Sequence, residues 1–221
     1  MKVVVSWSGG KDSCFACYKA IKEGYDVAWL LVMMESAGLS NFHLINSELL
    51  DAQAQAIGVP IIKQVTSPST YGRDFENALL QLKQRGVEGL VTGDVYDVAL
   101  HEASWLDRVC GEVGLQPVKP LWHRNTMEIV DEFINAGFKA TVVRVKREVL
   151  GLEWLGRELN AQFIRELPVG VDPCGENGEF HTFVTDGPIF KSSIEIVEAE
   201  KTKLNGYGHL EIKRFKVKQK A

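Results

Sequence analysis

The segment VVVSWSGGKDS, residues 3–13, decides the fold of this chain. Its three valines predict a buried strand, and the amphipathic run that begins near Lys11 predicts a helix. Between them lies a glycine-rich turn, Ser-Gly-Gly-Lys-Asp-Ser. Gly9 and Gly10 would let backbone N–H groups approach an anion, while the helix N-terminus and Lys11 add positive charge. The segment therefore predicts a phosphate-binding loop.

The polar side chains of this loop predict a metal ion beside the phosphates. The hydroxyls of Ser8 and Ser13 can donate hydrogen bonds to phosphate oxygens, whereas the ionised carboxylate of Asp12 only accepts them. Asp12 is therefore a candidate ligand for Mg²⁺. The spacing fits neither the common P-loop nor a dinucleotide-binding motif. The competing interpretation is a tight turn in which Lys11 is solvated and Asp12 and Ser13 cap the helix.

Composition limits the classes of protein that this chain can belong to. It has 221 residues, of which 45% are hydrophobic and 24% charged, with no long apolar run, so we expect no membrane partner. The Met-Lys start has no features of a signal peptide, which predicts a cytoplasmic location. A net charge of −4 argues against general nucleic-acid binding. The basic stretch from Lys213 to the C-terminus is interpreted as a solvated strand face, the alternative being a site for an acidic partner.

Cysteine spacing gives no zinc pattern. The chain has four cysteines, and Cys14 and Cys17 would share the apolar face of the helix that follows the loop. We expect both in the core. The alternative is a thiolate activated at the helix N-terminus.

Strands and helices alternate through the first half of the chain. Strands are expected at 26–34, 60–65 and 87–92, and helices at about 46–57 and 72–85 and from about Trp105. This order predicts an α/β fold, a doubly wound, Rossmann-like parallel sheet. Gly93 and Asp94 would then lie at the same sheet edge as the glycine loop and supply a second phosphate or metal contact. A turn with an aspartate cap is the competing interpretation.

Other polar residues fall on loops of this half. Glu35, Asn41 and His43 follow the strand at 26–34, in a loop expected to border the nucleotide, and are candidate polar contacts, unless the loop is closed by its own hydrogen bonds. Of these, Glu35 and His43 are the candidate substrate contacts. His101, near the start of a helix, is interpreted as a surface or capping residue.

Two prolines near 114–120 mark a domain transition. We expect a nucleotide-binding domain at 1–118 and a smaller α+β substrate-binding domain at 119–221, which ends in a hairpin around Gly206. Within it, DPCGENGEFHTF at 172–183 combines glycine breaks with carboxylates, which is typical of a functional loop, although a polar hairpin has the same composition. Glu176 and Glu179 would lie on the loop and Phe180 at the start of a strand.

These motifs together resemble one family across almost the whole chain. SGGKDS resembles the PP-loop of the ATP pyrophosphatase superfamily, and with it ESAG followed by FH, GD at 93–94, PLW at 120–122, WLGR at 154–157 and GENGEFHTF at 175–183 resemble the diphthine–ammonia ligase family. The resemblance implies ATP-dependent amidation by ammonium of diphthine on translation elongation factor 2, through an acyl-adenylate, releasing AMP and pyrophosphate. The stretch ALHE at 99–102 departs from the more basic pattern expected there.

The resemblance also implies roles for individual residues. The loop residues and Lys11 would stabilise the leaving phosphates, Asp12 and Asp94 would hold Mg²⁺, and Glu176 or Glu179 would orient ammonia or deprotonate ammonium. The trimethylammonium group of diphthine predicts a pocket with aromatic faces, for which the candidates are Trp122, Trp154 and Phe180.

Three alternatives to this function stay open. They are a PP-loop adenylating enzyme acting on a small carboxylic acid, one acting on a tRNA base, and a non-catalytic ATP sensor. The oligomeric state is also open, and a homo-oligomer is compatible with the sequence.

Overall fold

The computed structural model describes residues 1–35, 38–40, 43–97 and 105–220. Its contacts divide the chain into two compact units. The first unit comprises Met1–Ser8, Asp12–Gln55 and Val59–His123, and the second comprises Gly9–Lys11, Ala56–Gly58 and Arg124–Ala221. No helix in the described ranges is long and apolar enough to span a membrane.

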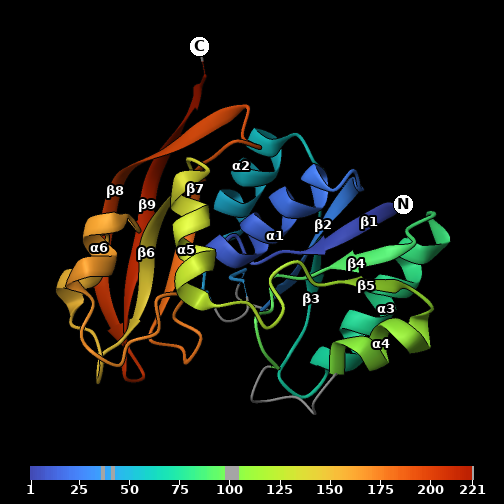
Figure 1. Ribbon diagram of the computed structural model, residues 1–221, viewed down its shortest axis with the longest axis horizontal. Helices are drawn as coiled ribbons and strands as arrows, with labels where there is room; N and C mark the ends of the chain where they lie inside the picture. Colours follow the sequence, from blue (N-terminus) through green and yellow to red (C-terminus); the bar gives the residue numbers. More distant parts are fainter. Residues whose placement is uncertain (36–37, 41–42, 98–104, 221) are drawn as a thin grey trace. The chain divides into compact units, whose positions relative to one another are not determined.

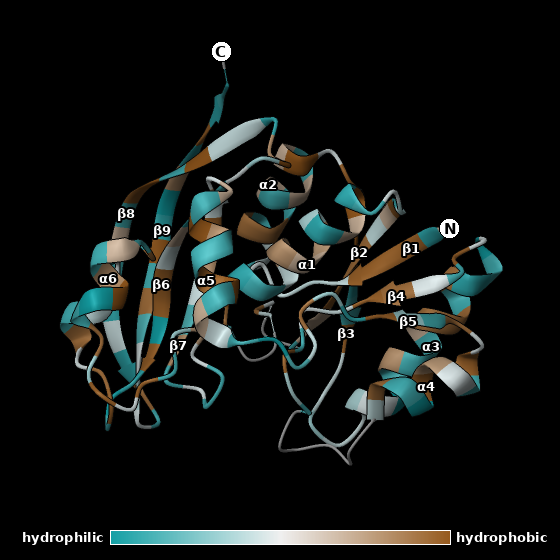
Figure 2. Ribbon diagram, in the orientation of Figure 1, coloured by the Kyte–Doolittle hydropathy of each residue, from teal (hydrophilic) through white to brown (hydrophobic). Residues whose placement is uncertain are grey.

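The first unit is built on a five-stranded parallel sheet of order β3-β2-β1-β4-β5 (Figure 1). Its elements, in chain order, are β1 (Lys2–Ser6), α1 (Lys11–Lys22), β2 (Asp26–Met34), α2 (Ser47–Ile57), β3 (Ile61–Val65), α3 (Tyr71–Gln84), β4 (Gly89–Val91), α4 (Trp105–Val113) and β5 (Gln116–Val118). The three valines of β1 are fully buried at the centre of the sheet, and the strand is strongly hydrophobic in Figure 2.

Helices cover both faces of this sheet. Helices α1 and α2 lie on one face and α3 and α4 on the other (Figure 1). On the second face Val4 and Leu31 pack with Phe75 and Leu79 of α3 and Val109 of α4. This is the doubly wound, Rossmann-like α/β fold that the sequence predicts. The strand order reverses between β1 and β4, and in such sheets ligands bind at the carboxyl ends of the strands at that point.

The short strand β5 was not expected from the sequence. It covers only Gln116–Val118 and contains Pro117, in a segment where the sequence pattern indicates a domain transition. Proline lacks an N–H and is therefore confined to sheet edges. The structure agrees with that rule, because β5 is the edge strand beside β4.

The second unit is a four-stranded antiparallel sheet of order β7-β6-β9-β8 with helices on one face (Figure 1). Its elements are α5 (Thr126–Asn135), β6 (Lys139–Lys146), the 3-10 turn η1 (Leu152–Trp154), α6 (Ala161–Glu166), β7 (Phe180–Asp186), β8 (Ser192–Leu204) and β9 (Tyr207–Gln219). Asn125 caps α5 and Asn160 caps α6, each accepting two backbone N–H bonds. The chain enters this unit between His123 and Arg124, and the sequence places the transition at 118/119.

The basic C-terminal stretch forms the end of the β8–β9 hairpin that lies away from the turn. Its cations pair with glutamates of β8: Arg214 Nη2 lies 3.2 Å from Glu198 Oε2, and Lys218 Nζ lies 3.0 Å from Glu195 Oε2. The stretch is therefore a charged, solvated strand face.

Candidate active site

The glycine loop joins β1 to α1 at the point where the strand order reverses. Gly9 adopts a left-handed φ of 79°, which glycine tolerates without strain. The N–H of Ser8 donates to Ser13 Oγ at 3.3 Å, and the two hydroxyls lie 3.1 Å apart. The loop is thus closed on the first turn of α1, which brings backbone N–H groups and two hydroxyls to one helix N-terminus.

Gly93 packs directly against this helix N-terminus. A Cβ placed on Gly93 would lie 2.5 Å from the carbonyl carbon of Asp12 and 2.7 Å from the Ser13 nitrogen. Only glycine fits there without a shift of the backbone. The contact brings the main chain at Asp94, whose N–H donates to Thr92 Oγ1 at 3.3 Å, beside that of Asp12. Burial, and then the negative charge of Asp94, raise the pKa of Tyr71 to about 12.

Lys11 belongs to the second unit and is held there by β7. Its side chain is buried, with an exposed fraction of 5%. Its backbone N–H donates to Thr182 Oγ1 at 3.0 Å, and the Gly9 carbonyl accepts from the Val184 N–H at 2.9 Å. The Lys11 ammonium donates to the Cys174 carbonyl and lies 5.7 Å from the Phe180 ring centroid. The loop is therefore fixed along the edge of β7.

A second loop, residues 172–179, is organised around the carboxylate of Asp172. Oδ1 accepts from the Cys174 N–H at 2.8 Å and from the Glu176 N–H at 3.3 Å. Oδ2 accepts from Thr126 Oγ1 at 2.8 Å. These bonds hold the peptide that presents the Cys174 carbonyl to Lys11.

Glu179 is a buried carboxylate surrounded by donors of its own loop. Its exposed fraction is 4%; Oε1 accepts from the Asp172 N–H at 3.1 Å and from Asn177 Nδ2 at 3.0 Å, and Oε2 accepts from the Asn177 N–H at 2.9 Å. Burial by itself would raise the pKa of Glu179, but hydrogen bonds from Asn177 and from backbone N–H groups outweigh it and lower the pKa. A carboxylate that is ionised and accepts several hydrogen bonds from the protein in this way is a weak base.

Glu176 differs from Glu179 although both lie on one loop. Its side chain is exposed, and its backbone N–H is fixed by Asp172. Of the two glutamates that the sequence singles out, Glu176 is therefore the one whose side chain is exposed.

Each aromatic candidate for the cation pocket already carries a cation of the protein. Lys119 Nζ lies 4.2 Å from the Trp122 ring centroid, and the Arg157 guanidinium carbon lies 4.2 Å from that of Trp154. In the second unit Trp154 and Phe180 both pack edge-on against Phe163, at 5.1 and 5.3 Å. Trp154 and Phe180 are core residues, whereas Trp122 is partly exposed and stacks on His123.

The loop after β2 is closed by its own backbone. The Glu35 N–H donates to the Leu39 carbonyl at 2.7 Å, and the Gly38 N–H donates to the Glu35 carbonyl at 3.1 Å. Glu35 and His43 therefore flank a self-bonded turn, and their predicted substrate contacts stay predictions. Asn41 and the segment around His101 lie outside the described residues.

Cys14 and Cys17 lie in the core, as expected. Burial raises the pKa of Cys14 well above its ordinary value, and burial raises the pKa of Cys17 to about 12. Both thiols stay protonated at neutral pH, which disfavours the activated-thiolate alternative.

The sequence did not predict a role in the site for three residues that organise it, Thr182, Asp172 and Thr126. Asp172 and Thr182 lie within the segment 172–183, so a systematic search of that motif for groups that bond to backbone would have found them. Thr126 has no sequence signal beyond its place at the start of α5.

Two family models match this chain, one in each half. The family model for the diphthamide synthase N-terminal domain matches residues 1–117, and the model for the C-terminal domain matches residues 125–217. Proteins named diphthine–ammonia ligase from Mus musculus and Danio rerio are each 28% identical, over 233 and 230 residues. The matches cover 90% of this chain and 84% of the mouse protein, and 91% and 88% for the fish protein.

Two solved structures are similar at lower levels. One is a predicted subunit of tRNA methyltransferase from Methanocaldococcus jannaschii, with a TM-score of 0.47 and 16% identity over 65% of this chain and 80% of that one. The other is a 4-thiouridine synthetase–RNA complex with bound ATP, with a TM-score of 0.43 and 17% identity over 62% and 40%. The two family models together span nearly the whole sequence, and the chain belongs to the diphthamide synthase family.

Proposed function

We propose that this chain is a diphthine–ammonia ligase, which uses ATP and ammonium to convert the carboxylate of diphthine on elongation factor 2 into the amide. The observation that carries the proposal is the match of both family domains to a chain whose glycine loop lies at the switch point of the parallel sheet. Relatives that bear this name cover most of the chain.

The first chemical step is activation of the carboxylate. An anionic carboxylate resists attack by ammonia, so its oxygen attacks the α-phosphorus of ATP, pyrophosphate leaves, and an acyl-adenylate forms. The N-terminus of α1 and the hydroxyls of Ser8 and Ser13 would bind the phosphates. Lys11 would exchange the neutral Cys174 carbonyl for a phosphate oxygen, which is the stronger acceptor because it is charged.

Asp12 and Asp94 are the residues that would hold Mg²⁺. They fit the ion, because both offer carboxylate oxygens and Gly93 brings their backbone segments into contact at the helix N-terminus. When bound, Mg²⁺ neutralises charge on the departing pyrophosphate.

The second step transfers nitrogen to the activated carbonyl. Ammonium must first lose a proton, and Glu176 is the proposed acceptor because hydrogen bonds occupy both carboxylate oxygens of Glu179 and lower its pKa, which makes it the weaker base. The ammonia nitrogen then attacks the acyl carbon, the bond to the AMP oxygen breaks, and the nitrogen loses a second proton to solvent as the amide forms.

The test measures AMP release from ATP and Mg²⁺, with and without ammonium and diphthine-bearing elongation factor 2. We expect AMP only with both, together with amidation of the factor by mass spectrometry. Lys11→Ala should reduce the rate by about 10²- to 10³-fold, the usual effect of losing one group that stabilises developing charge. The matched control is Lys22→Ala, an exposed lysine of the same helix, which should keep the rate.

Other outcomes redirect the proposal. AMP formation that does not depend on the factor would point to a small carboxylic acid as substrate. ATP binding without AMP under any condition would point to a sensor.

A further inference from the structure

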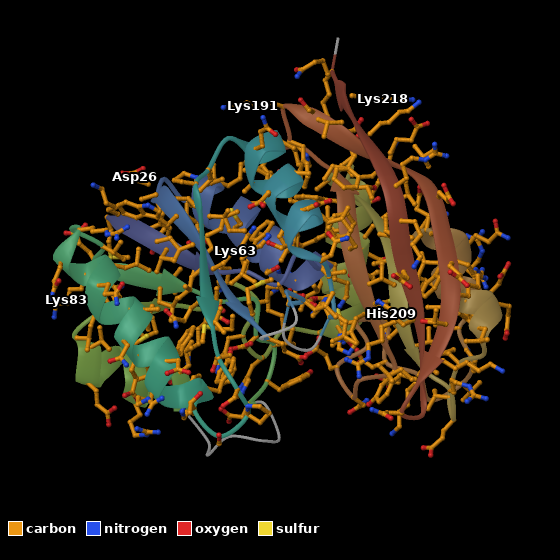
Figure 3. The ribbon with its side chains drawn as sticks, turned by 180° about the vertical axis from the view of Figure 1, so that it is seen from behind. Asp26, Lys63, Lys83, Lys191, His209 and Lys218 are labelled. Carbon is orange, nitrogen blue, oxygen red and sulfur yellow. The ribbon has the colours of Figure 1, made fainter. Side chains whose placement is uncertain are left out.

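One end of the antiparallel sheet in the second unit carries the acidic loop, residues 172–179. The last residues of β6 pair there with the first residues of β7 and β9. The turn between β8 and β9 lies at the same end, because the Arg147 N–H donates to the Gly206 carbonyl at 3.0 Å. In Figure 3, His209 is labelled near this end of β9 and Lys218 near the opposite end. We call this end the loop end of the sheet; it comprises residues 126–127, 146–151, 167–179 and 204–207.

Four large apolar side chains are exposed at the loop end. Their exposed fractions are 106% for Val169, 54% for Leu204, 41% for Met127 and 38% for Val149. Each comes from a different segment of the chain. An isolated apolar side chain on a protein surface needs no explanation, whereas several of them around one loop indicate an interaction surface.

Met127 and Val169 are both connected to the acidic loop at Asp172. Thr126 Oγ1 donates to Asp172 Oδ2 at 2.8 Å, and Met127 follows Thr126 in the first turn of α5. Val169 lies three residues before Asp172, in a tight turn that continues through Gly170, whose φ is 90°. Because an extended chain spans at most about 3.6 Å per residue, the Cα of Val169 lies within about 11 Å of that of Asp172. These two apolar side chains therefore border the start of the acidic loop.

Val149 and Leu204 are connected to the other end of the acidic loop through Lys146. The Lys146 N–H donates to the Glu179 carbonyl at 2.8 Å, and the Val149 N–H donates to the Lys146 carbonyl at 2.9 Å. Lys146 is also the strand partner of Tyr207, which in turn pairs with Leu204 across the hairpin. These two side chains therefore border the end of the acidic loop.

Charged side chains of both signs accompany the apolar ones at the loop end. Arg147 and Lys203 are exposed, and so are Glu148 and Glu176. A surface that binds an anionic membrane needs an excess of cations, which this end does not have. Apolar side chains among charges of both signs are typical of a contact with a folded protein, which has an apolar centre and a polar rim.

The substrate of the proposed reaction requires a protein contact beside the acidic loop. Diphthine is a side chain of a folded factor, so its carboxylate reaches Glu176 only when the surface of that factor lies against the segments that border the loop. Apolar side chains on this border would lose water in the contact and stabilise it. A free carboxylic acid would need no such border.

We infer that Met127, Val149, Val169 and Leu204 form the surface on which the diphthine-bearing elongation factor docks. The inference rests on the proposed function, which supplies the partner. It goes beyond that function, because none of the four residues takes part in binding ATP or in transferring nitrogen. Val169 has the largest effect among them, since its side chain is the most exposed.

The experiment measures amidation kinetics with diphthine-bearing elongation factor 2 and, by calorimetry without nucleotide, the Kd of the factor. Val169→Ser should raise the KM for the factor about fivefold, and Val149→Ser/Val169→Ser about tenfold or more, because each valine loses part of its burial in the contact. The Kd should rise in parallel. The kcat at saturating factor, the KM for ATP and the midpoint of urea unfolding should stay at their wild-type values, since both side chains are exposed.

The matched control is Val217→Ser. Val217 has an exposed fraction of 43% and lies on β9 at the opposite end of the sheet, so this variant should keep the wild-type KM and Kd for the factor. An equal rise of the KM in Val217→Ser and Val169→Ser would overturn the inference, because the effect would then not belong to the loop end.

The outcomes separate this inference from the proposed function. If the wild type amidates the factor and the folded Val149→Ser/Val169→Ser variant keeps its KM and Kd, the docking surface is refuted and the ligase stands. If the wild type forms no amide on the factor, the ligase is refuted and the surface loses its partner with it. A changed sedimentation coefficient of the variant with an unchanged KM would assign the four side chains to a contact between copies of this chain, which also overturns the inference.

Discussion

The glycine loop at 8–13 and the acidic loop at 172–179 are both shaped by hydrogen bonds, but they differ in which groups donate and which accept. In the glycine loop the bonds between Ser8 and Ser13 shape a turn at a helix N-terminus, where backbone N–H groups would bind phosphate in the proposed reaction. In the acidic loop the donors are the protein's own, and Asp172 and Glu179 accept them. Two of the three carboxylates of this motif therefore fix the shape of the loop, and the third, the exposed Glu176, is the one to which the proposed reaction assigns proton transfer.

The largest expected effect is that of a substitution at Gly93, which packs against the helix that follows the glycine loop. Gly93→Ala should lower the free energy of unfolding by about 1–3 kcal/mol, because the new Cβ would lie 2.5 Å from the Asp12 backbone. It should also abolish ATP binding, since the helix N-terminus must shift. Urea unfolding and ATP titration measure the two effects.

The control for that change is Gly111→Ala. A Cβ at Gly111 of α4 meets nothing within 4 Å, so alanine should be neutral or raise stability by about 0.5–1 kcal/mol. Equal behaviour of the two variants would show that the packing at Gly93 has no special role.

A second pair of changes separates shape from chemistry in the acidic loop. Glu179→Gln should cost about 1–3 kcal/mol of stability, because a buried acceptor loses its charge and partners. Glu176→Gln should leave stability unchanged and lower the rate of amide formation. Unfolding curves and AMP assays on both variants test this, and a stable Glu179→Gln with a reduced rate would reverse the assignment.

The same pair predicts a pH dependence. The folded-state pKa of Glu179 is lowered, so its contribution to stability is fully present above the unfolded pKa of about 4.3 and is lost as the pH falls through the folded value. Glu179→Gln should flatten the stability profile in that acidic window, and Glu176→Gln should not.

The smallest expected effect concerns the bond that joins the glycine loop to β7. Thr182→Val removes the acceptor of the Lys11 N–H and should cost about 1 kcal/mol, a rise of roughly fivefold in the KM for ATP. Thr182→Ser retains the hydroxyl and should restore the wild-type KM. An equal rise in both variants would indicate that the packing of the side chain, and not its hydroxyl, determines the KM.

Local sequence patterns predict most of the fold and part of the candidate site. The valines of β1, the glycine loop and the alternation of strand and helix predict the parallel sheet and its ligand edge, because these depend on neighbours in sequence. Strand β5 escaped because its three residues include Pro117. The pairing of Arg144 with His181 and His209 could not be predicted either, because it depends on the register across three strands, which no local pattern encodes. The difference between the hydrogen-bonded Glu179 and the exposed Glu176 could not be predicted, because it depends on hydrogen-bond geometry.

The antiparallel sheet has two outer strands, and each is protected in a different way against pairing with another polypeptide. Along β7 the Gly9 carbonyl accepts a hydrogen bond from the Val184 N–H, so the glycine loop also covers that edge. Along β8 alternating charges such as Glu195, Glu198 and Lys201 make an approaching strand unfavourable. The loop that binds phosphate in the proposed reaction thus also helps to keep the folded protein from aggregating.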